Sequence, residues 1–125
     1  MSPPEMAGWN LALRFALEVG ALVSLGHAAW QSSGDAARWV AVVAVPVAAA
    51  AIWGVFNVVG DPSRSGEAPV EVPGWVRLVI EVAVLGGGAV ALAVAGRSLL
   101  AVGFVLLVGL HYAVSRRRIE WLLAT

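Results

Sequence analysis

Long apolar stretches separated by short polar segments make up most of the chain. Four of them approach or reach the roughly 20 residues that a helix needs to cross a bilayer. They cover residues 9–30, 37–58, 74–95 and 98–115. Pro46 should kink the second helix without breaking it, because neighbouring helices can satisfy the freed backbone groups. The pattern predicts an all-α fold, a four-transmembrane-helix bundle that forms a single integral membrane domain over residues 1–125.

The polar segments between these stretches are short, with one exception. QSSGDAAR at residues 31–38 and the pair Gly96-Arg97 form turns after the first and third stretches. Residues 59–73 contain three prolines and four charged residues and are predicted to form a solvated loop. Because four spans return the chain to its starting side, the N-terminus, this loop and the C-terminus are expected on one side of the membrane.

The composition places the chain among membrane proteins. Hydrophobic residues make up 60% of the sequence and charged residues 13%, about half of the usual quarter for a soluble domain. The mean hydropathy of +0.85 agrees with this assignment. A net charge of zero gives no basic surface for nucleic acid. Cysteine is absent, which excludes disulfides, thiolate catalysis and cysteine-ligated metals.

All eight basic residues are arginines, and their placement predicts the orientation of the chain. Those on or near the side that holds the termini are Arg14, Arg64, Arg77, Arg116, Arg117 and Arg118. Arg38 and Arg97 lie on the other side. Because cytoplasmic segments are enriched in basic residues, both termini are predicted to be cytoplasmic. The last three arginines form a basic tail at the membrane surface, which fixes the topology or, alternatively, binds anionic lipid or a partner.

Two segments of the chain resemble each other. RFALEVGAL at residues 14–22 aligns without a gap with RLVIEVAVL at residues 77–85. Small residues recur every four positions at matching places: Gly20, Ser24 and Ala28 in the first copy, and Ala83, Gly87 and Ala91 in the second. Each copy is followed by a second span, so the chain is predicted to consist of two parallel two-helix repeats. The small residues are expected to allow close helix packing, within the chain or against a second protomer.

An arginine and a glutamate lie four residues apart in each copy, inside an apolar span. Residues with this spacing share a helix face. The two polar patches are the pairs Arg14–Glu18 and Arg77–Glu81. Glu18 lies about 13 Å along the helix axis from Trp9, where a carboxylate must find a partner, become protonated or face water. The economical arrangement joins both patches in one intramembrane polar network, which His111 joins from a similar depth.

Three of these stretches point to a known family. NLALRFALEVGALVSLGHAAW opens the first span, AIWGVF precedes a proline-containing loop, and RLVIEVAVLGGGAVALAVAG forms the third span. The chain thereby resembles, over nearly its whole length, the YrdB family of small bacterial membrane proteins, also catalogued as DUF2568. The resemblance implies a four-helix protein of the bacterial inner membrane and brings no catalytic residues. Family members tend to carry a proline soon after Trp-Gly-x-Phe, whereas here it is delayed to Pro62, which leaves the end of the second helix open.

Three functions are compatible with these features. The first, which we favour, is a structural or accessory membrane component in which the Arg–Glu pairs fix helix packing. The second is a small homodimeric transporter or proton-linked channel that uses Glu18 and Glu81. The third is an intramembrane enzyme or a binder of lipid or quinone, in which His111 supplies an acid–base group beside the glutamates.

The motif content of the chain favours a protein without enzymatic activity. No nucleophile pattern, metal motif or phosphate-binding loop is present, so neither a catalytic residue nor a metal or cofactor is predicted. A haem held by His27 and His111 is disfavoured, because the two histidines are predicted at opposite ends of the helices. The lipid bilayer is the predicted partner, nucleic acid is not, and the sequence identifies no protein partner.

Overall fold

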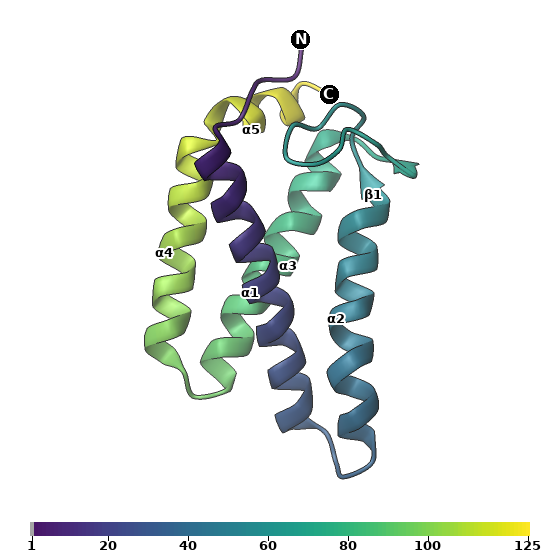
Figure 1. Ribbon diagram of the computed structural model, residues 1–125, viewed down its shortest axis with the longest axis vertical. Helices are drawn as coiled ribbons and strands as arrows, with labels where there is room; N and C mark the ends of the chain where they lie inside the picture. The colour runs from purple at the N-terminus through teal and green to yellow at the C-terminus, as the bar shows by residue number, and fades with distance from the viewer. Residues whose placement is uncertain (1) are drawn as a thin grey trace.

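The computed structural model describes residues 2–125, which are mainly helical (Figure 1). The helices are α1 (Gly8–Ser32), α2 (Ala37–Val55), α3 (Gly74–Val94), α4 (Ser98–Val114) and α5 (Arg116–Leu123). Two short strands, β1 (Phe56–Asn57) and β2 (Val70–Glu71), lie between α2 and α3. The long helices α1 to α4 run side by side along the longest axis of the molecule, and α5 lies across their end.

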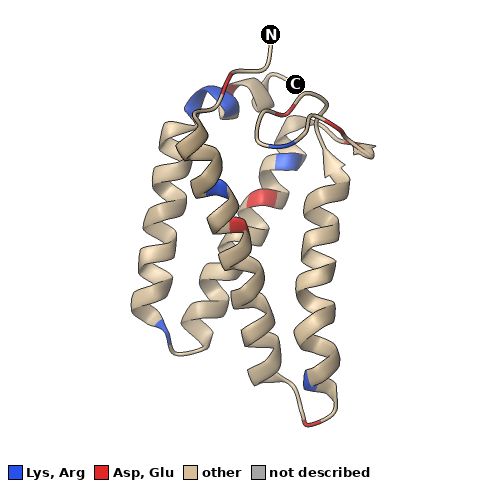
Figure 2. Cartoon of the chain, in the orientation of Figure 1, with Lys and Arg blue, Asp and Glu red and all other residues tan. Residues whose placement is uncertain are grey.

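The two ends of the molecule differ in character. Both chain termini, α5 and the loop of residues 56–73 lie at one end, here called the terminal end (Figure 1). The turns at residues 33–36 and 95–97 lie at the opposite end, here called the turn end. Most of the charged residues lie toward the terminal end, including those inside α1 and α3 (Figure 2).

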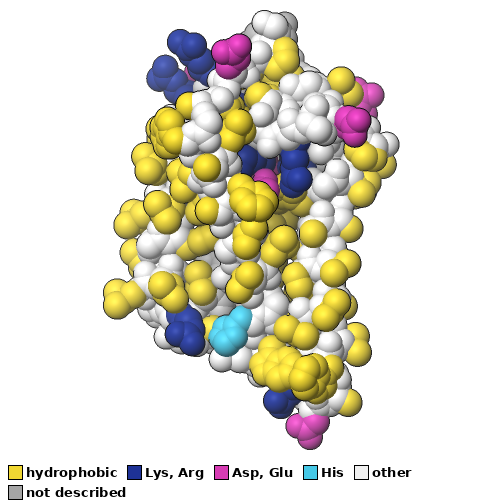
Figure 3. All heavy atoms as spheres, in the orientation of Figure 1, with side chains coloured by type: hydrophobic (Ala, Val, Ile, Leu, Met, Phe, Trp, Pro, Cys, Tyr) yellow, Lys and Arg dark blue, Asp and Glu magenta, His cyan; other side chains and the backbone are white. Residues whose placement is uncertain are grey.

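Three helices are long and apolar enough to cross a membrane: α1 with 25 residues, α2 with 19 and α3 with 21. The pair α4 and α5 also passes this test as one unit, although the chain bends by 70° between them. Hydrophobic side chains cover much of the outer face (Figure 3), and Leu99 is 89% exposed. These properties are consistent with a multi-pass membrane protein that has three or four spans.

The helices α1 and α3 approach each other closely and hold the core between them. At Gly88 a Cβ atom would lie only 2.8 Å from the Cα of Ala21. Buried Leu17 and Leu85 pack in the same cluster as Ala21, together with Trp53 of α2. Glycine at position 88 therefore sets the distance between the two helices, as small residues do in membrane proteins.

The small residues that were predicted to allow close helix packing lie in different surroundings. Ser24 and Ala91 are buried, Gly20 and Gly87 lie close to side chains of neighbouring helices, Ala28 is half-buried and Ala83 is exposed. The exposure of Ala83 differs from the prediction. The buried face of α3 contains Glu81, Leu85 and Gly88. Residue 83 lies about 200° around the helix from residue 81 and therefore on the opposite, exposed face.

The helix α2 ends at Val55, whereas the apolar pattern predicted an end at residue 58. Arg77 of α3 explains the early end. Its guanidinium donates hydrogen bonds to the carbonyl oxygens of Trp53 and Phe56, which therefore need no further helical turn to satisfy them. The end of the second helix depends on a contact from another helix, which an apolar pattern cannot reveal.

The segment after α2 folds back onto the helices and is not a fully solvated loop. Its strand β1 pairs in parallel with β2, so the predicted all-α fold gains a minimal two-stranded sheet. Gly60 and Gly66 have positive φ angles of 82° and 87°, and the Gly60 N–H donates to the Gly66 carbonyl at 2.9 Å. This tight turn leaves Val58 and Asp61 buried.

The chain turns sharply after α4, so the arginine run begins a new helix instead of extending the fourth span. In α5 the buried residues are Arg118, Trp121 and Leu122, whose spacing of three and four places them on one helix face. The first residue of α3, Gly74, lies directly beneath this face. A Cβ atom on Gly74 would lie 1.7 Å from the carbonyl oxygen of Leu122, so α5 rests on the glycine backbone.

Candidate functional site: a buried ion-pair cluster toward the terminal end

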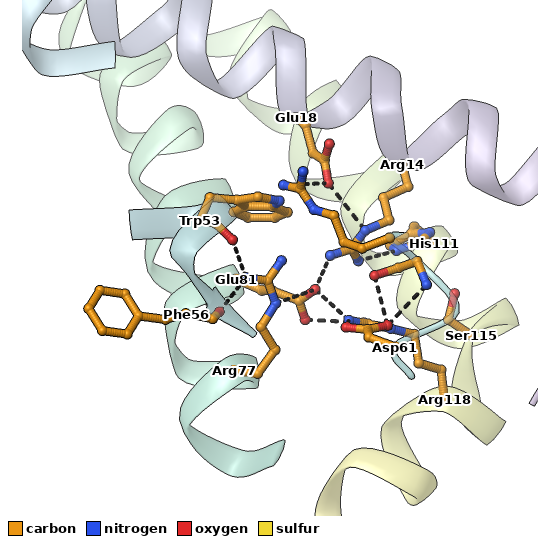
Figure 4. Close-up of polar contacts among 12 residues, drawn as sticks. Arg14, Glu18, Trp53, Phe56, Asp61, Arg77, Glu81, His111, Ser115 and Arg118 are labelled. Carbon is orange, nitrogen blue, oxygen red and sulfur yellow. Dashed lines mark hydrogen bonds and ion pairs between the residues drawn. The ribbon is translucent and has the colours of Figure 1, made fainter. Parts of the chain in front are cut away.

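Glu81 of α3 is the centre of a buried cluster of charged residues (Figure 4). Its side chain is 0% exposed, and arginines from two other helices donate to it. Arg14 of α1 contacts Oε1, and Arg118 of α5 donates to Oε1 at 2.9 Å and to Oε2 at 3.1 Å. One carboxylate therefore joins three helices.

Arg118 also binds a second carboxylate, that of Asp61 in the loop. Its Nε donates to Oδ1 at 2.8 Å and its Nη2 to Oδ2 at 2.6 Å, the two-pronged geometry in which arginine binds carboxylates most strongly. The basic tail predicted from the sequence therefore needs correction. Arg116 and Arg117 are exposed, but Arg118 is buried because the bend before α5 turns it inward.

Asp61 attaches the loop to the helices. Besides the contacts with Arg118, its Oδ1 accepts hydrogen bonds from the N–H and the hydroxyl of Ser63, at 3.0 and 2.9 Å. Burial alone would raise the pKa of Asp61. The hydrogen bonds and the charge of Arg118 outweigh this effect and, with Ser63, hold the pKa at about 2.

Asp61 should stabilise the protein at neutral pH and lose this effect only in strong acid. Its pKa lies below the ordinary value of 3.8, so its contribution is complete above that pH and is lost as the pH falls through about 2. The lowered pKa corresponds to about 2 kcal/mol of unfolding free energy. We expect Asp61→Asn to lose this amount at neutral pH and to flatten the acid side of the stability profile, measured by unfolding in detergent.

Glu67→Gln is the matched control for this prediction, because Glu67 lies in the same loop and is exposed. Glu67→Gln should leave the dependence of the unfolding free energy on pH unchanged. Equal stability of the two variants at neutral pH would show that the Asp61–Arg118 contact does not hold the loop.

Arg14 extends the cluster to α4. Its Nη1 lies 3.2 Å from Nε2 of His111, whose Nδ1 lies 2.7 Å from Oδ1 of Asn10. A guanidinium can only donate, so Nε2 accepts and the hydrogen is assigned to Nδ1. Nδ2 of Asn10 then donates to Oγ of Ser115 at 2.8 Å. This chain of hydrogen bonds ties the beginning of α1 to the end of α4.

Arg77 serves mainly as a cap for α2. Its Nη1 donates to the carbonyl of Phe56 at 2.9 Å and also to that of Trp53, while its Nε lies 3.8 Å from Oε1 of Glu81. A cation at this end of a helix also interacts favourably with the helix dipole. The local Arg77–Glu81 pair is therefore looser than the contacts that Glu81 makes with the two other helices.

Glu18 and Arg64 form the outer rim of the cluster. Glu18 Oε1 lies 3.2 Å from Nε of Arg14 and 3.7 Å from Nη2 of Arg64. The guanidinium groups of Arg14, Arg64 and Arg77 lie 5.2, 5.6 and 5.0 Å from the ring centre of Trp53. The rim is partly accessible, since Glu18 is 17% and Arg64 30% exposed.

The charges of the cluster do not balance. Its four cations are Arg14, Arg64, Arg77 and Arg118, and its three carboxylates are those of Glu18, Asp61 and Glu81. With every group ionised, the cluster carries one positive charge in excess. Each carboxylate has an arginine nitrogen within hydrogen-bonding distance, at 3.2 Å for Glu18, 2.6 Å for Asp61 and 2.9 Å for Glu81. Within residues 2–125 no group of three or more histidine, aspartate or glutamate residues could hold a metal ion.

The structure brings all five residues of the predicted polar network to one place. These are Arg14, Glu18, Arg77, Glu81 and His111. The residues that sequence reasoning missed are Asn10, Trp53, Asp61, Arg64, Ser115 and Arg118. Arg118 precedes Trp121 and Leu122 by three and four residues, a spacing that places it on the apolar face of α5. Nothing in the loop sequence distinguishes Asp61 from a solvated acid. His27 lies apart from the cluster, near Trp30.

Comparison with known proteins identifies the family of the chain. The family model described as "Protein of unknown function (DUF2568)" matches residues 12–108, and the chain belongs to this family. It is 42% identical over 114 residues to the uncharacterized protein YrdB of Bacillus subtilis (strain 168). This alignment covers 91% of the chain and 93% of that protein. The family resemblance inferred from the sequence is thereby confirmed, and no solved structure matches the chain.

Proposed function

We propose that this protein is a structural or accessory component of the bacterial inner membrane, in which buried charges fix the arrangement of its helices. One observation carries the proposal: the side chain of Arg118 binds both Glu81 and Asp61. This contact joins α5, α3 and the loop, and Arg14 adds α1 through the same carboxylate. Buried polar contacts of this kind can specify one arrangement of helices among several of similar apolar packing.

The surroundings of the two glutamates favour this role over transport. A carboxylate that carries a proton or an ion must exchange its partners during each cycle. Glu81 is fully buried and is bound by two arginines, so every exchange would leave buried cations unpaired. Glu18 lies at the rim, but it too is paired with an arginine. We therefore propose a packing role for both residues, in preference to a homodimeric transporter.

The cluster also supports a protein without enzymatic activity. The hydroxyl of Ser115 accepts a hydrogen bond from Asn10, and the ring of His111 has Asn10 and Arg14 as its partners, so the serine hydroxyl and the imidazole are not paired with each other. His111 is itself held between Asn10 and Arg14. A histidine with both ring nitrogens occupied in this way is not positioned to activate a nucleophile.

A measurement of proton flux separates the structural role from transport. The full chain is reconstituted in liposomes that enclose a pH-sensitive dye, and an imposed pH difference is followed with time. We expect the flux to equal that of protein-free liposomes, for the wild type and for Glu18→Gln. A flux that Glu18→Gln abolishes while the variant remains folded would overturn the proposal in favour of transport.

For the topology we propose four spans, arranged as two parallel two-helix repeats with both termini in the cytoplasm. The position of both termini and the loop at one end supports this, as does the enrichment of arginine toward that end. Because the chain contains no cysteine, single cysteines at exposed Ser32 and Ser65 report on the two ends separately. A membrane-impermeant maleimide added to intact cells should label Ser32→Cys and spare Ser65→Cys. The reverse pattern would contradict the proposed orientation.

A further inference from the structure

Three hollows follow one another along α1, beside the rim of the cluster, and the second and third also border α2. The first, of about 300 Å³, lies under the loop and is lined by charged side chains of the rim. The second, of about 160 Å³, shares Phe15, Glu18 and Arg64 with the first and is otherwise mostly apolar. The third, of about 470 Å³, shares Leu22 with the second and reaches His27. Neighbouring hollows share lining residues, and the three together are here called the α1–α2 groove, which has a polar head and an apolar body.

The dimensions of the α1–α2 groove fit a lipid chain. From Arg14 to His27 it follows α1 for about 20 Å, at 1.5 Å per helical residue. One leaflet contributes about 15 Å of hydrocarbon to a bilayer, so the groove is somewhat longer than a leaflet is deep. Its flank on α1 exposes Phe15, Val19 and Val23, which are 66%, 43% and 66% exposed. Figure 3 shows charged side chains in a hollow of this otherwise hydrophobic face.

The polar head of the groove has hydrogen-bond donors without acceptors. Trp53 lines the groove and is 3% exposed, and its indole N–H has no acceptor among the described residues. The Nε of Arg64, which also lines the groove, likewise finds no acceptor in residues 2–125. Buried donors are nearly always satisfied in proteins, so these groups indicate an acceptor supplied from outside the chain.

The charge of the polar head indicates that this acceptor is an anion. Four arginines face three carboxylates in the cluster, and Arg64 at the rim is the most exposed of the four. Arg64 is held only loosely, because its Nη2 lies 3.7 Å from Glu18, beyond hydrogen-bonding distance. Burial lowers the pKa of the Arg64 guanidinium, an effect that a bound anion would oppose. Arginine binds phosphate oxygens through two parallel hydrogen bonds.

We propose that the α1–α2 groove binds one anionic phospholipid, with its phosphate on Arg64 at the polar head and one acyl chain along the apolar body. The site is separate from the structural role of Glu81. Neither Glu81 nor its partner Arg118 lines any of the three hollows.

Lipid titration of the full chain, followed by native mass spectrometry from detergent, tests this proposal. The probes are phosphatidylglycerol, phosphatidylcholine with the same acyl chains, and inorganic phosphate. We expect one phosphatidylglycerol molecule to be retained per chain in preference to phosphatidylcholine. Arg64→Gln should weaken this binding about tenfold or more, which is the effect of losing one hydrogen bond to a charged group. The matched control Arg117→Gln removes an exposed arginine at the same end and should have no such effect.

A second pair of variants tests the apolar body without altering any charge. Ala50 lines the groove and Ala48 does not, and both are exposed on α2. Ala50→Trp should fill the groove and abolish the one-to-one binding, whereas Ala48→Trp should preserve it. Circular dichroism during heating verifies that each variant is folded.

Several outcomes would overturn the lipid site. Equal retention of phosphatidylcholine would show that the charge is not recognised, and equal weakening by Arg117→Gln would indicate adsorption to the surface. Binding that Ala50→Trp leaves intact would exclude the acyl chain from the groove. Displacement of the lipid by inorganic phosphate at similar concentration would identify a site for a free anion. None of these results depends on proton flux, so the lipid site and the structural role succeed or fail separately.

Discussion

Replacement of Glu81 by glutamine is expected to lower the free energy of unfolding by about 3–5 kcal/mol, which is the cost of removing one partner from a buried ion pair. Glutamine preserves the size of the side chain but carries no charge. Arg14 and Arg118 would then remain buried without the carboxylate that joins them. The measurement is reversible unfolding of the full chain in mixed detergent micelles, followed by circular dichroism.

Glu120→Gln provides the control for this experiment. Glu120 lies on α5 and pairs with Arg116 at 3.6 Å, but both side chains are largely exposed, at 62% and 80%. Exposed pairs contribute little to stability, so this variant should unfold like the wild type. If Glu81→Gln also unfolded like the wild type, the buried cluster would not hold the helices together.

Gly74→Ala is the second substitution for which we expect a large effect. The added methyl group would overlap with the carbonyl of Leu122, since a Cβ atom at this position would lie 1.7 Å from the oxygen and 2.4 Å from the carbon. Backbone atoms cannot rotate away as a side chain can, so α5 must move and draw Arg118 away from Glu81 and Asp61. We expect a loss of about 3 kcal/mol, at the upper end of the usual cost of overpacking.

The same substitution at Gly86 separates this clash from the general effect of alanine in a helix. Gly86 also lies in α3, but no atom lies within 4 Å of a Cβ added there. Gly86→Ala should be neutral or slightly stabilising, because alanine favours the helix more than glycine does. Equal stability of the two alanine variants in thermal unfolding would show that α5 does not rest on Gly74.

The hydrophobic pattern predicted the helices well, because the length of an apolar run reflects the helix that it forms. Three of the four predicted stretches correspond to α1, α3 and α4 within a few residues. The end of α2, which the sequence left open, lies three residues before the end of the predicted stretch, because Arg77 from another helix binds the last carbonyls. The sequence of α2 alone cannot predict a contact with a residue of α3.

The sequence predicted which residues belong to the charged site better than it predicted which of them form pairs. A glutamate in an apolar span must find a partner. This principle identified Glu18, and the repeat extended the argument to Glu81. The spacing of four residues suggested Arg77 as that partner, yet Glu81 is bound more closely by Arg14 and Arg118. Helical spacing shows which side chains share a face. The close approach of α1 and α3 at Gly88 decides which side chain from the other helix reaches that face.

Arg118 shows why a run of like charges is ambiguous in a membrane protein. Three successive arginines at the end of a span are typical of a topology signal. Here the chain bends by 70° before them, and one of the three points inward with Trp121 and Leu122. The bend is a tertiary feature: Ser115, which lies in it between α4 and α5, accepts a hydrogen bond from Asn10 of α1.

We propose that one buried contact between Arg118 and Glu81 holds the C-terminal helix α5 against α3. A double-mutant cycle of Arg118→Leu and Glu81→Gln, measured by unfolding in detergent, tests it most directly. Because the two side chains share hydrogen bonds of 2.9 and 3.1 Å, the cycle should give a coupling energy of about 1–3 kcal/mol. Effects that add within about 0.5 kcal/mol, as they do for distant sites, would contradict the claim.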